Sequence, residues 1–444
     1  MKNYTKEDVL NLVRDEDVEF IRLQFTNLHG VLKNVAITSS QLEKVLDNGC
    51  LFDVSAIDGV RRVTGSERVL VPDFSTFEIF PWRPQQGKVA RLLCEVYVPE
   101  GKPSEVDPRY ILRRTLKAAA EMGYTFEVGP ECEFFLFETD ENTNPTVITH
   151  EQAGYFDVGP LDEGENARRD IVMNLEDMGF EIEASHHEAA PAQHEIDLAY
   201  GEALDVADSI ITFKLAVRTL AKRHGLHATF MPKPRDDING SGMHINMSLK
   251  KNGVNIFSDP DDENGLSKEA YWFIGGLMKH LPAMAPITNP LVNSYKRLIP
   301  GYEAPVYVAW SAKNRNQMIR IPARMTGNST RIELRSPDSS ANPYLTIALC
   351  LAAGLDGINK KIETPKAVDA DINAMTAEER KALGIKKLPG TLVEALEEFK
   401  NDPFIKESLG EPAYEKYLII KEKEWNDYNT HVSAWELKEY LNRY

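Results

Sequence analysis

The stretch ECEFFLFE, which begins at Glu131, has the aromatic and apolar composition of a β-strand buried in a sheet. Alternate residues of a strand point to the same face, so Glu131 and Glu133 share one face while Cys132 and Phe134 share the other. Adjacent carboxylates on a strand that favours burial repel each other, and an unpaired charge is costly to bury. The fold must therefore supply something that offsets this repulsion.

A second pair of carboxylates occurs in EASHHEAAPAQHEIDL, where two strand-like runs flank a turn that contains Pro191. A hairpin centred between Pro191 and Ala192 would place Glu188 directly opposite Glu195, and like charges paired in this way destabilise a sheet. A solvated acidic face would explain one such pair. For both pairs on apolar strands, a bound divalent cation is the simpler explanation.

Two further segments carry polar side chains in strand-like runs. In NGSGMHINMS, a glycine-containing loop can bring backbone amides close to a ligand, and His244 shares a face with Ser248. In RIELRSPD, Glu333 shares a face with Arg335. Taken alone, the first pattern is typical of a structural, hydrogen-bonded histidine and the second of an exposed salt-bridge ladder.

Together these segments provide ligands that suit a hard divalent cation. Oxygen donors dominate, which favours Mg²⁺ or Mn²⁺, and the single imidazole leans slightly towards Mn²⁺. The six ligands exceed what one hydrated Mg²⁺ takes, so we expect two metal ions. The candidate ligands are Glu131, Glu133, Glu188, Glu195, His244 and Glu333.

Arginines accompany these ligands: Arg297 in NSYKRLIPGYEAP, Arg315 and Arg320 in SAKNRNQMIRIP, and Arg335. Arginine suits bidentate contacts to carboxylates and phosphates. Metal ligands beside an arginine cluster indicate phosphoryl transfer from a nucleotide, although the sequence has no Walker loop, kinase signature or dinucleotide fingerprint. From the residues alone, we expect a metal-dependent enzyme that handles phosphate and a carboxylate, with a metal-dependent hydrolase as the rival interpretation.

Chain length and net charge limit the class of protein to which this sequence can belong. A chain of 444 residues exceeds one ordinary core, so we expect two domains, and PEGKPSEVDPR is the best boundary. The net charge of −17 argues against nucleic acid or an anionic membrane as partners. No apolar run has the length of a membrane span, and the polar, acidic N-terminus is unlike a targeting peptide. The four cysteines lack metal or redox spacing, so we expect a cytoplasmic protein.

Periodicity predicts the local elements. We expect strands at VEFIRLQFT and VARLLCEVYVP after one short N-terminal helix, and a helix over residues 110–122 beyond the boundary. Further helices are expected at GENARRDIVMNLEDMGF, at NPYLTIALCLAAGLDGINKKI and through the charged C-terminal segment.

Five of these motifs resemble bacterial type I glutamine synthetase of the Gram-positive, non-adenylylated branch: NGSGMH, NSYKRLIPGYEAP, SSANPYL, ECEFF and HHEAAPAQHE. The resemblance runs over essentially the whole chain. It implies an α+β fold, with a small β-grasp-like N-terminal domain over residues 1–103 and a larger catalytic domain over residues 104–444, built on a curved antiparallel sheet with surrounding helices. It also implies a homo-oligomer, a dodecamer of two hexameric rings with each active site between two subunits.

The implied activity is ATP-dependent ligation of ammonia to the γ-carboxylate of L-glutamate through γ-glutamyl phosphate, giving L-glutamine, ADP and phosphate. Carried over by motif, one metal would be held by Glu133, Glu188 and Glu195, and the other by Glu131, His244 and Glu333. The glutamate-binding residues would be Asn239, Gly240, Arg297, Glu303 and Arg335. The ATP-binding residues would be Glu183, Ser248, Arg315 and Arg320.

Three residues would act in catalysis by the same resemblance. Arg315 would neutralise charge on the transferring phosphoryl group. Glu303 would sit on a loop that closes over the acyl phosphate and excludes water. Asp53 would reach in from a neighbouring subunit and take a proton from ammonium.

The chain departs from the family pattern in DVSAIDGV, where the family usually reads Asp-Gly-Ser-Ser-Ile-Glu-Gly-Phe. Val54 replaces a glycine, and Ala56 replaces a serine associated with the ammonium pocket. If the glycine position needs a positive φ, Val54 is strained or forces a new loop path. A related γ-glutamyl ligase that uses another amine, and a catalytically impaired regulatory paralogue, therefore stay open as alternatives.

Two positions bear on regulation. Ala374 in DINAMTAEER stands where the enzymes controlled by adenylylation carry a tyrosine, so that control is expected to be absent. Arg62 matches a residue used for glutamine feedback in the Gram-positive branch. The resemblance also adds a nitrogen-regulator protein to the expected partners, beside L-glutamate, ammonia and ATP.

Overall fold

A six-stranded sheet backed by two helices forms the N-terminal part of the computed structural model, which describes residues 3–55, 57, 65–323 and 329–444. The strand order is β2-β1-β6-β4-β3, with β5 beside β6. Strands β1 and β6 run parallel and the other pairs are antiparallel. The elements are α1 (Lys6–Asp15), β1 (Val18–Thr26), β2 (Leu32–Thr38), α2 (Ser39–Asn48), β3 (Cys50–Asp53), β4 (Glu67–Pro72), η1 (Phe74–Thr76), β5 (Glu78–Ile79) and β6 (Lys88–Tyr97).

The two helices cover one face of this sheet and enclose its core. Val9 of α1 and Leu42 of α2 are fully buried against Ile21, Leu23 and Leu92 of the central strands. This arrangement confirms the expected β-grasp-like domain. Helix α2 was not predicted, because its short amphipathic pattern lies between two stronger strand patterns.

A ten-stranded sheet forms the centre of the remaining chain, in the order β15-β16-β17-β12-β7-β9-β8, with β10 and β11 beside β7 and β13 beside β12. Only the β15–β16 pair is parallel among these described strands, so the sheet is mixed rather than wholly antiparallel. The strands are β7 (Tyr124–Glu138), β8 (Ile182–His187), β9 (Gln193–Leu198), β10 (Gly201–Glu202), β11 (Leu226–Thr229), β12 (Met243–Lys251), β13 (Val254–Asn255), β15 (Trp310–Ser311), β16 (Ile319–Arg320) and β17 (Ile332–Leu334). A separate small pair joins β14 (Tyr307–Val308) to β18 (Lys386–Lys387).

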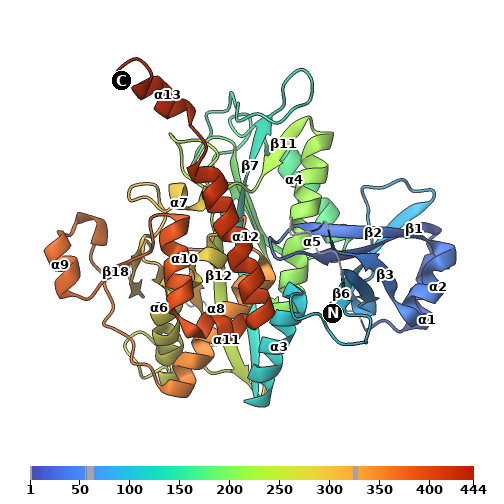
Figure 1. The fold of residues 1–444 in the computed structure, drawn as a ribbon, viewed down its shortest axis with the longest axis horizontal. Coiled ribbons are helices and arrows are strands. Elements are labelled where there is room, and N and C mark those ends of the chain that lie inside the picture. The colour runs from blue at the N-terminus through green and yellow to red at the C-terminus, as the bar shows by residue number, and fades with distance from the viewer. Residues whose placement is uncertain (1–2, 56, 58–64, 324–328) are drawn as a thin grey trace.

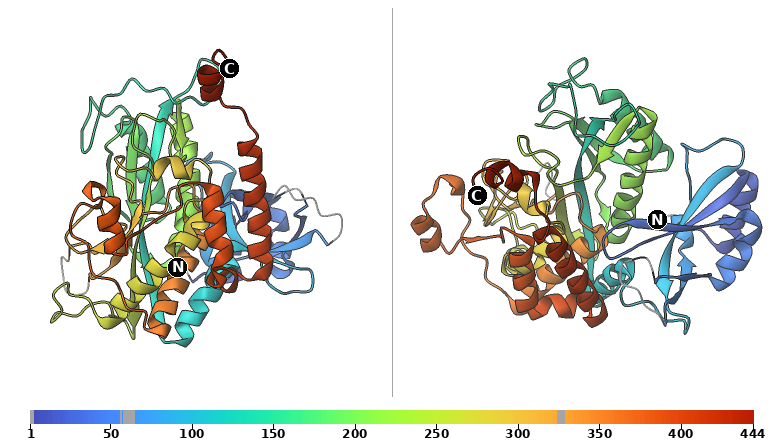
Figure 2. Two further views of the ribbon diagram at one scale, coloured as in Figure 1. Left: turned by 60° about the vertical axis from the view of Figure 1, so that its left-hand side comes forward. Right: turned by 45° about the horizontal axis from the view of Figure 1, so that its top comes forward.

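Helices pack around this sheet, and Figure 2 shows the N-terminal domain beside them as a separate blue lobe. Helices α3 and α5 contact β7, and α8 packs between α3 and α6. The predicted helix over 110–122 begins slightly earlier, because Asp107 caps it and Pro108 occupies its first turn. The helical elements are α3 (Pro108–Glu121), α4 (Glu165–Asp177), α5 (Ala203–Arg223), α6 (Lys268–Thr288), α7 (Ser294–Arg297), α8 (Pro343–Lys360), η2 (Ile372–Ala374), α9 (Ala377–Ala382), α10 (Leu392–Asn401), α11 (Pro403–Leu409), α12 (Glu411–Asn429) and α13 (Ala434–Tyr440).

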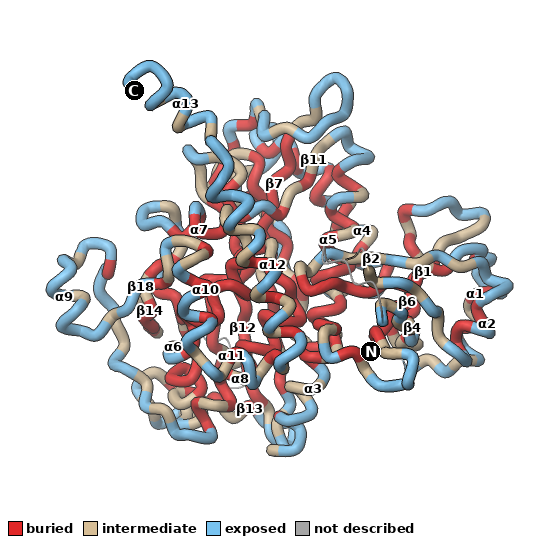
Figure 3. Tube along the Cα trace, in the orientation of Figure 1, coloured by how far each residue is buried: buried red, intermediate tan, exposed pale blue. Residues whose placement is uncertain are grey.

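Strand β7 presents two chemically different faces. Cys132 and Phe134 are fully buried in the core that the helices share with the sheet, which Figure 3 shows in red at the centre of the molecule. Glu131 and Glu133 therefore point away from this core, as the alternation predicted. Further along this second face the side chains are apolar and buried, so the stretch around Glu131 and Glu133 is where the fold can build a polar site.

A buried ion network joins the N-terminal domain to the catalytic part. Arg109 at the start of α3 lies 2.8 Å from carboxylate oxygens of both Asp73 and Asp208, and Asp208 also accepts a 2.7 Å hydrogen bond from Tyr344. Because Asp73 belongs to the N-terminal domain while Asp208 and Tyr344 lie on α5 and α8, the network fixes how the two parts meet.

None of the helices within the described ranges combines the length and apolar character that a bilayer span requires.

Candidate active site

Acidic side chains from three neighbouring strands gather on the face of β7 that carries Glu131 and Glu133. His244 of β12 pairs with Glu131, while Glu195 and Asp197 of β9 pair with Glu133 and Glu131. Opposed residues in adjacent strands hold their side chains close together. The sheet register therefore concentrates four carboxylates and one imidazole at one place.

The hairpin formed by β8 and β9 has a different register from the predicted one. His186, not Glu188, lies opposite Glu195, and the backbone amide of Glu188 donates a 2.8 Å hydrogen bond to the carbonyl of Gln193. The connecting loop spans residues 189–192 and is centred one residue earlier than predicted. Glu188 is consequently a diagonal neighbour of Glu195 on the same face, which still brings the two carboxylates together.

A cavity of about 590 Å³ opens over this face and is lined by acidic, basic and amide groups. Most residues predicted for metal and glutamate binding border it. These are Glu131, Glu133, Glu188, Glu195, Asn239, Gly240, His244, Arg297, Glu303 and Arg335. Glu333 is fully buried beside the cavity, where it pairs with Arg335 at 2.6 Å and Arg320 at 3.0 Å.

Two groups of side chains in the cavity have the composition and spacing of metal sites. Each offers ligand atoms that lie within 4.8 Å of one another. The first group matches one predicted triad: Glu131, His244 and Glu333. The second contains a histidine that was not predicted: His186, Glu188 and Glu195. Carboxylate oxygens with one imidazole suit Mg²⁺ or Mn²⁺, so both groups fit such a cation.

Glu133, predicted as the third ligand of the second group, lies between the two groups. Its Oε2 accepts 2.8 Å hydrogen bonds from the Gln193 side chain and the Gly242 amide. Its Oε1 lies 3.9 Å from Nε2 of His244. Its role as a metal ligand stays a prediction.

Crowding perturbs the ionisation of these carboxylates. Burial, followed by the charges of Glu133 and Asp197, raises the pKa of Glu195 well above its usual range. Burial, followed by the charge of Glu131, raises the pKa of Asp197 to about 7. Burial also acts to raise the pKa of Glu131, but the hydrogen bond and charge of His244 outweigh it and lower that pKa to about 2. The cluster therefore favours either bound protons or a bound cation.

Chelation should lower the melting temperature of the protein, and the drop should be larger near pH 8 than near pH 6. A carboxylate whose pKa is raised by folding contributes stability below its unfolded pKa of about 4, and this stability is lost as the pH rises through the folded pKa. For Asp197 that loss is centred at about 7. A cation that binds only the folded state offsets the repulsion that the lost protons leave behind. Thermal unfolding in Mg²⁺ and in EDTA, at each pH, measures this drop. If the melting temperature in EDTA equals that in Mg²⁺ at both pH values, the cation site is contradicted.

The arginines that line the cavity form a basic wall beside its carboxylates. Arg297 is almost completely buried, and its Nη1 donates a 2.8 Å hydrogen bond to the Ser336 carbonyl. A Cβ at Gly242 would lie 2.7 Å from Nη2 of Arg297, so a side chain there would displace this guanidinium group. Arg335 is held by Glu333 at the cavity edge. Fixed guanidinium groups beside acidic ligands suit an anionic substrate.

Glu303 lies at the mouth of the cavity in a strained loop. Its φ of 56° is in the left-handed region that non-glycine residues rarely adopt, and such strain is frequent at functional loops. Its Oε2 accepts a 3.0 Å hydrogen bond from the Asn239 side chain. The structure thus joins two of the predicted glutamate-binding residues directly.

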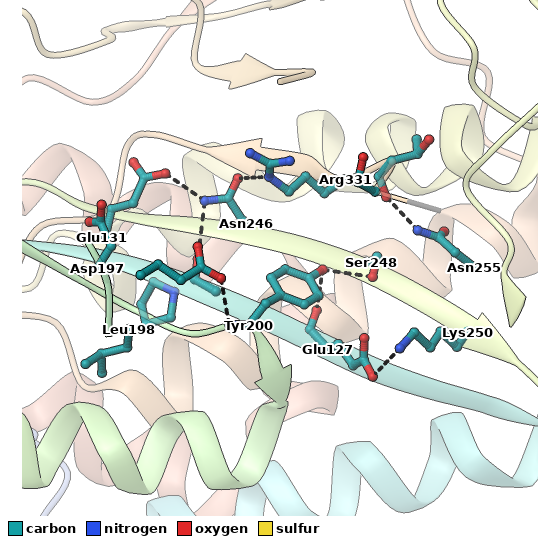
Figure 4. Close-up of a pocket in the computed structure, with 15 residues that line it drawn as sticks. Glu127, Glu131, Asp197, Leu198, Tyr200, Asn246, Ser248, Lys250, Asn255 and Arg331 are labelled. Atoms are coloured by element: carbon teal, nitrogen blue, oxygen red, sulfur yellow. Dashed lines mark hydrogen bonds and ion pairs between the residues drawn. The ribbon is translucent and has the colours of Figure 1, made fainter. Parts of the chain in front are cut away.

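A second cavity of about 440 Å³ adjoins the first, since Glu131 and Asp197 border both. Glu183 and Ser248, two of the predicted ATP-binding residues, line it. Figure 4 shows Asn246 between Glu131 and Arg331, bonded to Glu131 at 2.9 Å and to Arg331 at 3.1 Å. The other two predicted ATP-binding residues, Arg315 and Arg320, line the first cavity.

Sequence reasoning missed several residues of the two cavities, including His186, Asp197, Asn246 and Tyr155. The first three carried a usable signal, because each lies two residues from a predicted residue on the same strand face. Tyr155 lies in the long connection between β7 and α4, where no periodic pattern marks it.

Asp53 lines neither cavity. It ends β3 in the N-terminal domain, is exposed, and accepts hydrogen bonds from the Ser55 amide at 2.6 Å and the Ser66 hydroxyl at 3.1 Å. Val54 does not have a positive φ, so the predicted strain is absent there. Ala56 and Arg62 lie outside the described residues.

Comparisons with known proteins agree with this geometry. The family model for the glutamine synthetase catalytic domain matches residues 105–440, and that for the glutamine synthetase beta-Grasp domain matches residues 17–99. The glutamine synthetase of Clostridium saccharobutylicum is 60% identical with 100% of both chains covered, and that of Methanosarcina mazei is 52% identical with 99% of this chain and 98% of the relative covered.

Solved structures also match this chain over nearly its whole length. A GmaS/ADP complex superposes with a TM-score of 0.89 at 32% identity, covering 98% of this chain and 99% of that one. A glutamine synthetase of Plasmodium falciparum superposes with a TM-score of 0.87 at 26% identity, with 99% of each chain covered.

Proposed function

The chain belongs to the glutamine synthetase family and forms glutamine from glutamate and ammonia with ATP, and we propose that its two adjoining cavities divide this reaction between them. The cavity beneath the arginines would hold glutamate and the metal ions, and the second cavity would hold the nucleoside of ATP. The observation that carries this proposal is that Glu131 and Asp197 border both cavities. The nucleotide phosphates would then meet the glutamate carboxylate beside Glu131.

The enzyme uses divalent metal ions, and we propose two per site, Mg²⁺ or Mn²⁺. Glu131, His244 and Glu333 would hold one, while Glu188 and Glu195 would hold the other with Glu133 or His186. Bound cations would neutralise charge on the phosphates of ATP during phosphoryl transfer.

Glutamate would be held at the basic wall. Arg335 would pair with a substrate carboxylate, because its side chain lines the cavity while Glu333 fixes its orientation. Arg297, Asn239 and Gly240 would complete the glutamate site. The γ-carboxylate would then attack the γ-phosphate, giving γ-glutamyl phosphate.

Glu183 and Ser248 would contact ATP in the second cavity, and Arg315 and Arg320 would contact its phosphates in the first. This division orients the phosphate end of the nucleotide towards glutamate. Glu303 would close over the acyl phosphate and exclude water, as its position at the cavity mouth and its bond to Asn239 suggest.

Asp53 would serve the active site of a neighbouring subunit, since it lies in the N-terminal domain and lines neither cavity of its own chain. We propose a dodecamer of two hexameric rings as the working assembly. Helix α13 projects from the body of the subunit (Figure 1), and the helix and the residue after it expose large apolar side chains that a further copy would cover. These include Trp435, Leu437, Tyr440 and Leu441.

We propose a cytoplasmic enzyme, because its four cysteines are free and three are buried without disulfide partners. Feedback by glutamine through Arg62 and control by a nitrogen-regulator protein are further proposals, which rest on the sequence resemblance. We propose the domain boundary at residue 103 because this residue lies in the connection between β6 and α3.

Phosphate release that depends on both ATP and glutamate tests the proposed reaction. Ammonium should support it better than any member of a panel of primary amines. A preference for another amine would identify a related γ-glutamyl ligase, in keeping with Val54 and Ala56 near Asp53. Bound ATP and glutamate without phosphate release would identify a catalytically impaired paralogue.

A further inference from the structure

Glu151 occupies a buried position behind the β8–β9 hairpin, outside both cavities. It is 4% exposed and lies in the connection between β7 and α4. Its carboxylate accepts hydrogen bonds from the backbone amides of Ala192 and Glu163 and lies 2.7 Å from Nε2 of His187. Two of these partners belong to the hairpin that carries Glu188 and Glu195.

His187 extends this contact to the residue beside it. Its Nδ1 lies 2.6 Å from the carbonyl oxygen of Glu188 and 3.0 Å from that of Gly154. Both ring nitrogens therefore face hydrogen-bond acceptors, and Glu151 is the side-chain acceptor beside Nε2. Glu151 thus ties the buried His187 ring to the connection between β7 and α4, and a buried polar group that loses its hydrogen-bond partner is costly.

Ala192 is the second attachment point, at the far end of the loop. Its φ of 65° lies in the left-handed region that favours glycine. A residue held in this region persists only where its surroundings fix it. The hydrogen bond from the Ala192 amide to Glu151 is such a restraint.

The side chains of the hairpin divide between two faces. His186, Glu188 and Glu195 line the cavity, while His187 and His194 are fully buried behind them. Glu151 therefore contacts the hairpin from the side opposite the carboxylates. Its two attachment points, at His187 and Ala192, bracket the loop that follows Glu188.

We propose that Glu151 is a positioning residue that holds the hairpin so that Glu188 stays close to His186 and Glu195. The inference rests on the proposed metal site. Metal ligands must be held in place by groups behind them, and losing such a group weakens metal affinity. The Glu131–His244–Glu333 group is built on β7, β12 and β17, so its affinity should not depend on Glu151.

Electron paramagnetic resonance of Mn²⁺ added to the full-length protein without substrates tests this. The wild-type protein should bind Mn²⁺ in two classes of site. Glu151→Gln keeps the side-chain size but replaces one accepting carboxylate oxygen by an NH2 group that cannot accept hydrogen bonds, and it should weaken one class by about 10–100-fold while leaving the other unchanged. Glu163→Gln is the matched control, because Glu163 lies in the same connection with an exposed side chain, and it should change neither class.

Glu151→Ala should weaken the same class further, and Glu151→Gln carries the test if the alanine variant does not fold. Wild-type affinity in both classes, or equal weakening of both, would overturn the positioning role. A wild-type protein with fewer than two classes would instead overturn the metal site on which the inference rests. The two failures are therefore distinguishable.

Discussion

Replacing Glu131 by glutamine should lower the rate of glutamine formation by about 10²–10³-fold, the scale of losing one electrostatic contact to the transition state. Glu131 borders both cavities, and its Oε2 lies 3.0 Å from Nδ1 of His244 within the group that Glu333 completes. Glutamine keeps the shape of the side chain but removes the charge that attracts a cation. Steady-state phosphate release over a series of Mg²⁺ concentrations measures the effect.

Glu133→Gln should also lose activity, but with a different dependence on metal concentration. Glu133 is held by Gln193 and Gly242 between the two groups, whereas Glu131 belongs to one of them. Glu138→Gln is the control, because it makes the same change on the same strand at a residue that lines neither cavity. Wild-type rates for both Glu131→Gln and Glu133→Gln at low metal concentration would contradict a binuclear site.

The alternation of side chains along a strand depends only on the local sequence, and it correctly predicted which residues of one strand share a face. Glu131 and Glu133 share a face because they lie two residues apart within one strand, whatever the rest of the fold does. His244 joins them only because β12 pairs with β7. The same alternation places Asn246 on the face of His244, and it would have found Asp197 had it been extended one step beyond Glu195. The roles of the ATP-binding residues came from the resemblance, because these residues lie on segments far apart in the chain and share no phosphate-binding loop.

The hairpin register could not be predicted in the same way. Register depends on the conformation of the loop, and here Ala192 adopts a positive φ that its residue type does not suggest. That conformation places His186 rather than Glu188 opposite Glu195. Because the register shifted by an even number of residues, the carboxylates kept their common face and the metal-site prediction survived the error.

Mixing an Asp53→Ala protein with an Arg335→Ala protein should restore activity that neither variant has alone. Asp53 ends β3 in the N-terminal domain, whereas Arg335 lines the cavity on the catalytic sheet. If each active site takes Asp53 from one subunit and Arg335 from its neighbour, some mixed interfaces carry both intact residues. With equal amounts and random assembly, about a quarter of the sites should be intact.

The two variants would be unfolded, mixed and reassembled, and glutamine formation would be measured after the rings are isolated by size. Each variant reassembled alone is the control for background activity, and reassembled wild-type protein sets the full scale. If each subunit instead supplied both residues of its own active site, mixing would restore no activity, because every chain would carry one of the two defects. Mixed rings of full size that stay as inactive as their parents would therefore exclude a site shared between subunits, and Asp53 would have no role in the reaction of a neighbour.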